Sequence, residues 1–112
     1  MNHQANKNNR LPPNLYRFFW EYNQQEIDIH KHYELIMARI MARGNWQSMV
    51  WLREIYSGKK IRDFLFRKGW KVVPPRELNY WALVGGISDR KRKELLRKAS
   101  KTNPIWRDRI VH

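Results

Sequence analysis

The spacing of the apolar residues constrains the fold of this chain more than any other feature. Between residues 29 and 43 they recur three and four positions apart, which places them on one stripe of a helix. The members of the stripe are Ile29, Tyr33, Ile36, Met37, Ile40 and Met41. Asp28 is a suitable N-cap for this helix and Gly44 a suitable stop. The pattern therefore predicts a helix over residues 29–43.

Glycine and proline divide the rest of the chain into further short helices. We expect these helices over residues 14–21, 46–57, 59–68, 75–84 and 88–100. Gly69 is expected to end a helix, and Pro74-Pro75 keeps residues 70–75 from continuing one. Only residues 70–73 could form a strand, and one strand makes no sheet. The sequence predicts an all-α fold, a compact bundle of five to six short helices with no significant sheet.

The chain has the length of one domain, because 112 residues are too few for two hydrophobic cores. Residues 1–10 are rich in Asn, Gln and Lys and are predicted to form a disordered N-terminal arm. Residues 11–101 are expected to form the helical domain, and residues 102–112 a C-terminal tail. The sequence has no cysteine and no apolar run typical of a membrane span or signal peptide. A cytoplasmic protein without a membrane partner is the simplest interpretation.

Positive charge is concentrated in the C-terminal half. The first 56 residues carry seven basic and five acidic residues, a net charge of +2. Residues 57–112 carry sixteen basic and five acidic residues, a net charge of +11. Such a half predicts an anionic partner, which could be nucleic acid, an acidic protein surface or an anionic membrane.

The segment 88–101 is the most specific basic feature. On a helical wheel Leu95, Leu96 and Ala99 form an inner face. The opposite face carries the residues that we predict to contact phosphates: Arg90, Lys91, Lys93, Arg97, Lys98 and Lys101. Such a helix can lie along a nucleic-acid backbone and release condensed counterions. The alternative is a solvated helix whose charge only keeps the protein soluble.

Two other features are compatible with nucleic-acid binding. Residues 46–68 fit a helix-turn-helix loosely, although Glu54 stands where a small residue normally lets the two helices approach. Trp70 and Trp106 lie in basic contexts and could stack on exposed bases. Trp46 and Trp81 lie within apolar stripes, so we expect them in the core.

The sequence matches no catalytic or metal-binding template. Gly85-Gly86 follows a helix and lacks the spacing of a phosphate-binding loop. His30 and Glu34 could share one metal ion, but no third ligand accompanies them. Glu21, Glu26 and Asp28 form the one acidic cluster, which a solvated surface explains. We therefore expect a protein that is not an enzyme and that uses neither a metal nor a cofactor.

Several apolar motifs occur in a recurring order. They are Trp20 after two phenylalanines, Ile36 to Gly44, Trp51-Leu52 with Tyr56, and Leu78 to Trp81 followed by Gly86-Ile87. Over residues 16–87 this order resembles a family of small uncharacterised bacterial domains that are often encoded beside abortive-infection-type nucleotidyltransferase toxins. The resemblance implies an antitoxin-like partner of a toxin protein. The chain departs from the family pattern at Glu21-Tyr22-Asn23, and the basic segment 88–101 lies beyond the shared region.

Two functions follow from these observations. The first is a non-catalytic, antitoxin-like protein that binds a toxin, with a partner surface formed by Phe18, Phe19, Trp20 and Trp51. The second is an independent basic module, for example a transcriptional regulator, that binds nucleic acid through phosphates. An exposed apolar patch would favour the first function, and a continuous positive face with buried tryptophans would favour the second.

Overall fold

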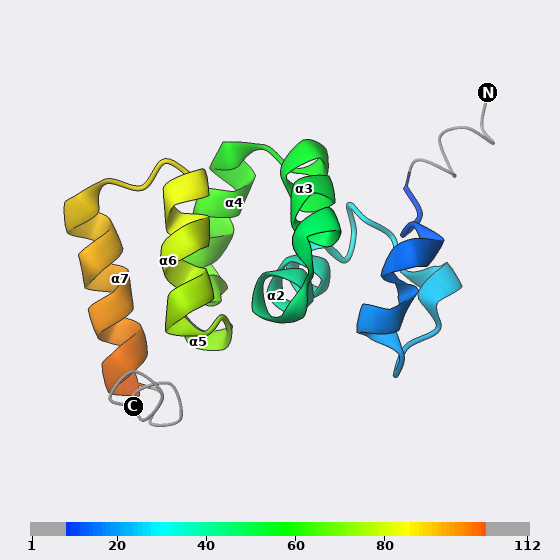
Figure 1. Cartoon of the computed structure of the whole chain (residues 1–112), viewed down its shortest axis with the longest axis horizontal. Helices are drawn as coiled ribbons and strands as arrows, with labels where there is room; N and C mark the ends of the chain where they lie inside the picture. The colour runs from blue at the N-terminus through cyan, green and yellow to red at the C-terminus, as the bar shows by residue number, and fades with distance from the viewer. Residues whose placement is uncertain (1–8, 103–112) are drawn as a thin grey trace.

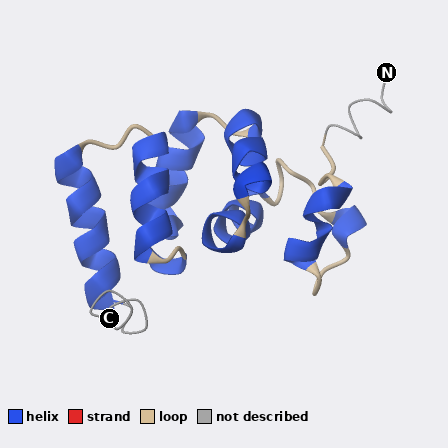
Figure 2. Cartoon of the chain, in the orientation of Figure 1, coloured by secondary structure: helices blue, strands red, loops and turns tan. Residues whose placement is uncertain are grey.

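The computed structural model describes residues 9–102, and every regular element among them is helical (Figure 2). The elements are η1 Pro13–Phe19, η2 Gln24–Glu26, α2 Tyr33–Arg43, α3 Trp46–Ile55, α4 Gly58–Phe64, η3 Leu65–Gly69, α5 Trp70–Val72, α6 Pro75–Val84 and α7 Asp89–Thr102. The predicted all-α bundle of short helices is confirmed. Figure 1 shows α7 packed at the end of the molecule opposite to the N-terminal segment.

The N-terminal segment is held against α2 rather than free in solution. Its short helix η1 is a 3₁₀-helix that buries Leu15 and Phe19. Two residues of the predicted disordered arm are ordered, because the Asn9 carbonyl accepts a hydrogen bond from the Ile29 N–H at 2.8 Å and the backbone of Arg10 forms an isolated antiparallel β-bridge with that of Asp28. Residues 1–8 of that arm lie outside the described residues.

Helix α2 begins four residues later than the sequence predicts, at Tyr33. Asp28 does not cap it. The Asp28 carboxylate instead accepts hydrogen bonds from the backbone N–H groups of His30 and Lys31 and closes a turn before the helix. The predicted end is correct, since Gly44 follows Arg43 as the C-cap. Ile36, Met37, Ile40 and Met41 are buried as their spacing predicts.

Helices α4, η3 and α5 form one uninterrupted rod from Gly58 to Val72. The prediction that Gly69 ends a helix is therefore wrong, and the predicted break over residues 70–75 is reduced to Val73 and Pro74. Gly69 has an ordinary helical φ of −57°, and a Cβ atom there would lie 2.6 Å from a Leu65 methyl carbon and 3.2 Å from the Phe64 ring. It is a position of close packing within a π-helical turn. The rod ends where Pro74 prevents its continuation.

The C-terminal end of helix α6 lies close to the rod. The helix begins at Pro75, as predicted, and buries Leu78, Trp81 and Ala82. The backbone of Gly85 approaches α4 so closely that a Cβ atom there would lie 3.3 Å from the Cα of Arg62. Gly86 then adopts a positive φ of 74°, which turns the chain toward α7.

Candidate nucleic-acid interface

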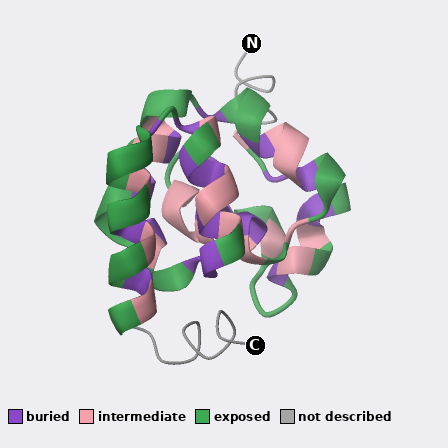
Figure 3. Cartoon of the chain, turned by 60° about the vertical axis from the view of Figure 1, so that its left-hand side comes forward, coloured by how far each residue is buried: buried purple, intermediate pink, exposed green. Residues whose placement is uncertain are grey.

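Helix α7 presents its cations outward because its apolar residues are few and lie on one side. Leu95 and Ala99 are buried, and Leu96 is partly buried, against α5 and α6. In Figure 3 the helix that leads to the C-terminal trace shows exposed ribbon on its outer side and buried ribbon toward its neighbours. The predicted inner face of this helix is confirmed.

All six residues predicted to contact phosphates are exposed, and they are Arg90, Lys91, Lys93, Arg97, Lys98 and Lys101. Two acidic residues share the helix, and each forms an ion pair with an arginine three positions later: Asp89 with Arg92, and Glu94 with Arg97. Within residues 9–102 the remaining five cations of α7 make no ion pair. We call the six exposed cations the α7 basic face.

Arg92 differs from the other cations of α7 because it faces the bundle. Its side chain is only 15% exposed and donates a hydrogen bond to Asp89 and a longer one, of 3.4 Å, to the Asn79 Oδ1 atom of α6. Arg92 therefore fastens the first turns of α7 to α6, and it is not part of the basic face.

The basic face continues onto α5 through a contact that the sequence did not predict. The Lys98 Nζ atom lies 4.6 Å from the centroid of the Trp70 ring, and the Lys71 Nζ atom lies 5.3 Å from it. Trp70 is partly buried, so two ammonium groups from two helices meet over one aromatic ring. The basic sequence around Trp70 is the signal that points to this contact. Trp106, the other stacking candidate, lies outside the described residues.

Three basic residues of the rod, Lys60, Arg67 and Lys68, are more strongly engaged by the protein itself. Arg67 and Lys68 both form ion pairs with Glu34 of α2. Arg67 also donates a hydrogen bond of 2.7 Å to the Tyr33 hydroxyl, and the Lys60 Nζ atom lies 4.2 Å from the centroid of the Tyr33 ring. These contacts join the rod to α2, so these cations are less available to an external anion than those of α7.

Residues 46–68 do not form the closely packed pair of helices that a helix-turn-helix requires. Helix α3 packs mainly against α2, whereas α4 packs mainly against α6. Ser57 caps α4, because its Oγ atom accepts a hydrogen bond of 3.1 Å from the Lys60 N–H. The two helices are therefore consecutive elements with different partners.

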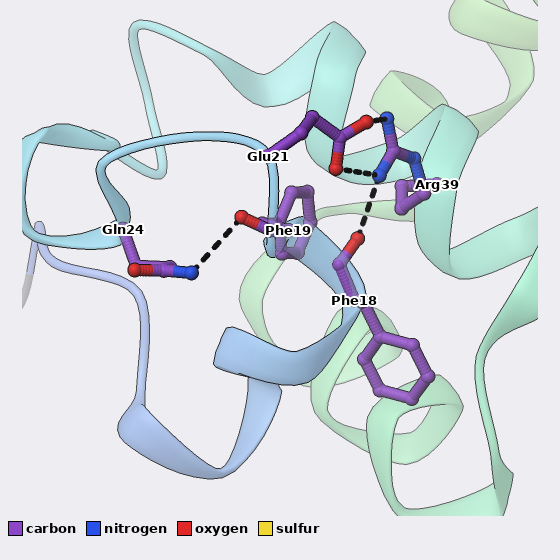
Figure 4. A network of polar contacts seen from close by, with 5 residues as sticks. All are labelled: Phe18, Phe19, Glu21, Gln24 and Arg39. Carbon is purple, nitrogen blue, oxygen red and sulfur yellow. Dashed lines mark hydrogen bonds and ion pairs between the residues drawn. The ribbon is translucent and has the colours of Figure 1, made fainter.

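Three of the four residues of the predicted partner surface are buried or partly buried. Phe19 is completely buried, Phe18 and Trp51 are partly buried, and only Trp20 is widely exposed, at 74%. The expected exposure of Phe19 is therefore wrong. The reason lies in the polar frame around η1 (Figure 4), where Arg39 donates to the Phe18 carbonyl at 2.8 Å and the Gln24 side chain donates to the Phe19 carbonyl at 3.0 Å. Both bonds hold η1 with the Phe19 ring inward.

The two tryptophans that the sequence predicts in the core differ in their exposure. Trp81 is fully buried, as predicted, but Trp46 is 66% exposed. Helix α3 buries the line through Ser48 and Leu52. Trp46 lies two residues before Ser48, which is about 200° around the helix and therefore on the opposite side.

The carboxylates of Glu21 and Asp28 make structural contacts within the protein. Glu21 pairs with Arg39, and the Asp28 carboxylate accepts backbone hydrogen bonds. Among residues 9–102 no group of three or more His, Asp or Glu side chains could hold a metal ion. In the same residues no helix has the length and apolar character needed to cross a bilayer.

Comparison with known proteins gives a family match over part of the chain. Residues 15–65 match the model of a family described as a family of unknown function, DUF6922. The match covers most of η1 and all of η2, α2, α3 and α4, and it ends before α5, α6 and α7. No curated protein matches the chain. No solved structure matches it either.

Proposed function

We propose that this protein is a non-catalytic module that binds nucleic acid through phosphates, with α7 as the contact element. One observation carries the proposal: the α7 basic face holds six exposed cations, and five of them make no ion pair among the described residues. Cations that make no ion pair within the protein can neutralise phosphates, and each neutralised phosphate releases counterions condensed on the nucleic acid with a gain in entropy.

The length of the basic face suits a phosphate backbone. Arg90 and Lys101 are eleven residues apart, which is roughly 17 Å along a helix. A DNA strand carries one phosphate per about 3.4 Å of helix axis, so roughly five phosphates fall within that length. The number of unpaired cations and the number of phosphates within reach are therefore similar.

The test is a salt titration of binding to a labelled DNA duplex of mixed sequence. We expect the logarithm of the affinity to fall with the logarithm of the salt concentration with a slope of about −4 or steeper. Replacing Arg90, Lys93 and Arg97 together with Ala should weaken binding and make the slope shallower by about two to three. The matched control removes three exposed cations elsewhere: Arg17→Ala, Lys31→Ala and Arg43→Ala.

The control should bind nearly as tightly as the unmodified protein, because its three cations lie outside α7. Circular dichroism should show both triple variants folded, since all six positions are exposed. Equal loss of affinity in the two variants would mean that net charge alone attracts the duplex. No binding at low salt would reject a nucleic-acid role for α7.

A second candidate is the antitoxin-like role that the resemblance implies, in which the chain binds a toxin protein such as a nucleotidyltransferase. It is favoured by Trp20 and Trp46, which are 74% and 66% exposed and are of a residue type enriched at the centres of protein interfaces. In that case Trp20→Ser should abolish rescue of bacterial growth from the toxin, whereas the α7 triple variant should still rescue. Rescue that depends on α7 and not on Trp20 would contradict this assignment.

A further inference from the structure

A groove beside the α7 basic face has no assigned role. It lies between the C-terminal half of α7 and the first turn of α6 and has a volume of about 680 Å³. This volume is within the range of about 300–1,000 Å³ that is typical of small-molecule sites. The first turn of α6 contributes Pro74 and Pro75, and α7 contributes Leu96. These three side chains give the groove an apolar lining.

The same groove has charged residues on both sides. Arg76 comes from α6 and Arg97 from α7, and Glu77 lies next to Arg76. Arg76 is exposed and makes no ion pair within the part of the chain that the structure describes. An occupant that satisfies this lining has a flat or apolar body and at least one negative charge.

The groove is continuous with the basic face, because Arg97 belongs to both. Lys93 and Lys101 lie one helical turn before and after Arg97 on the same side of α7. A polyanion that follows α7 therefore passes the mouth of the groove. The part of such a chain that can enter an apolar groove is a base, since its phosphates are retained by the cations outside.

We propose that the groove binds an unpaired base of a single-stranded nucleic acid whose backbone lies on the α7 basic face. This inference rests on the proposed function and specifies its substrate class. Bases in a duplex are paired and stacked, so they cannot enter the groove, whereas the bases of a single strand can turn outward. The guanidinium planes of Arg76 and Arg97 can stack on a base, and the Glu77 carboxylate can accept a hydrogen bond from an exocyclic amino group.

The test separates the contribution of the bases to the binding affinity from that of the phosphates. Fluorescence anisotropy would compare three labelled ligands at one salt concentration: a DNA strand of about 16 nucleotides, an abasic strand of equal length and charge, and the corresponding duplex. We expect the strand that carries bases to bind about tenfold more tightly than the abasic strand, because stacking acts in addition to charge. The abasic strand measures the contribution of the phosphates alone.

Two variants locate the effect in the groove. Leu96→Gln places a polar group in the apolar lining, and Arg76→Gln removes a guanidinium at an exposed position where folding is not at risk. Both variants should lose most of the preference for bases and retain affinity for the abasic strand. The matched control is Leu83→Gln, which changes a 56% exposed leucine at the far end of α6. It should retain the preference.

The outcomes distinguish this inference from the function on which it rests. Equal affinity for the abasic and normal strands would overturn the groove assignment and leave phosphate binding by α7 intact. No binding of any of the three ligands would overturn both proposals. Binding of an acidic, leucine-containing peptide that Leu96→Gln abolishes and the DNA strand does not displace would assign the groove to a protein partner instead.

Discussion

Arg39 and Glu21 form a bidentate ion pair that joins α2 to the residues directly after η1. The two guanidinium nitrogens of Arg39 donate to the two carboxylate oxygens at 2.9 and 2.7 Å. One of these nitrogens also donates to the Phe18 carbonyl at 2.8 Å (Figure 4). The hydrogen bond from Arg39 is the main reason why the pKa of Glu21 is lowered from 4.5 to about 2. The position of η1 on α2 therefore depends on an ionised carboxylate.

The first prediction concerns pH. Because folding lowers the pKa of Glu21, the folded state favours the ionised form, and this stabilisation is present above about pH 4.5 and is lost as the pH falls toward 2. Urea denaturation of the unmodified protein and of Glu21→Gln should show a difference at pH 6 that shrinks between pH 4.5 and 2. A difference that is constant over this range would contradict the role of the charge.

The second prediction concerns a buried hydroxyl. Tyr56 is buried and its hydroxyl donates a hydrogen bond of 2.6 Å to the Ile29 carbonyl, and burial raises the pKa of this phenol. Tyr56→Phe leaves that carbonyl without its donor and should cost about 1–2 kcal/mol of unfolding free energy. Tyr16→Phe, at a partly buried position of η1, is the control and should cost less. Denaturant melts of both variants would make the comparison.

The third prediction concerns two glycines. A Cβ atom at Gly85 would lie 3.3 Å from the Arg62 backbone, so Gly85→Ala should separate α6 from α4 and cost about 1–3 kcal/mol. At Gly58 the nearest atom would be 3.9 Å away, so Gly58→Ala should be neutral or stabilise the protein by up to about 1 kcal/mol. Thermal melts would measure both effects, and similar values for the two variants would contradict the close crossing.

The fourth prediction concerns two tryptophans. Trp46→Gln should change the unfolding free energy by less than about 0.5 kcal/mol, because the side chain lies mostly in solvent. Trp81→Ala should cost about 3–5 kcal/mol, because it empties a fully buried site. Chemical denaturation followed by circular dichroism would measure both. A large loss in Trp46→Gln would show that Trp46 belongs to the core.

The sequence was sufficient for the helices that carry a clear apolar stripe. Leu95 and Ala99 of α7 and the stripe of α2 from Ile36 to Met41 are buried as their spacing predicts. Their inner faces follow from helical periodicity alone, since each helix packs one side against the bundle. The outward position of the α7 cations follows from the same pattern.

Other features depend on contacts between segments that are distant in the sequence. Gly69 has the local signature of a helix end, but the packing of Leu65 and Phe64 around it keeps the rod continuous. Phe19 belongs to an aromatic cluster that could equally face solvent, and the hydrogen bond from Arg39 of α2 to Phe18 holds it inward. The groove beside α7 also combines residues from two helices, so no local sequence pattern could predict it.

The π-helical turn Leu65–Gly69 sets the rotational phase of the rod that contains it. A π-helical turn holds one residue more than an α-helical turn, and one residue corresponds to about 100° of an α-helix, so winding the same five residues as an α-helix would rotate the later side chains by roughly a quarter of a turn. Trp70 would then point away from Lys98, and the link between α5 and the basic helix would be lost. The number of residues in one turn of the rod thus determines whether two basic segments, distant in the sequence, form a single surface.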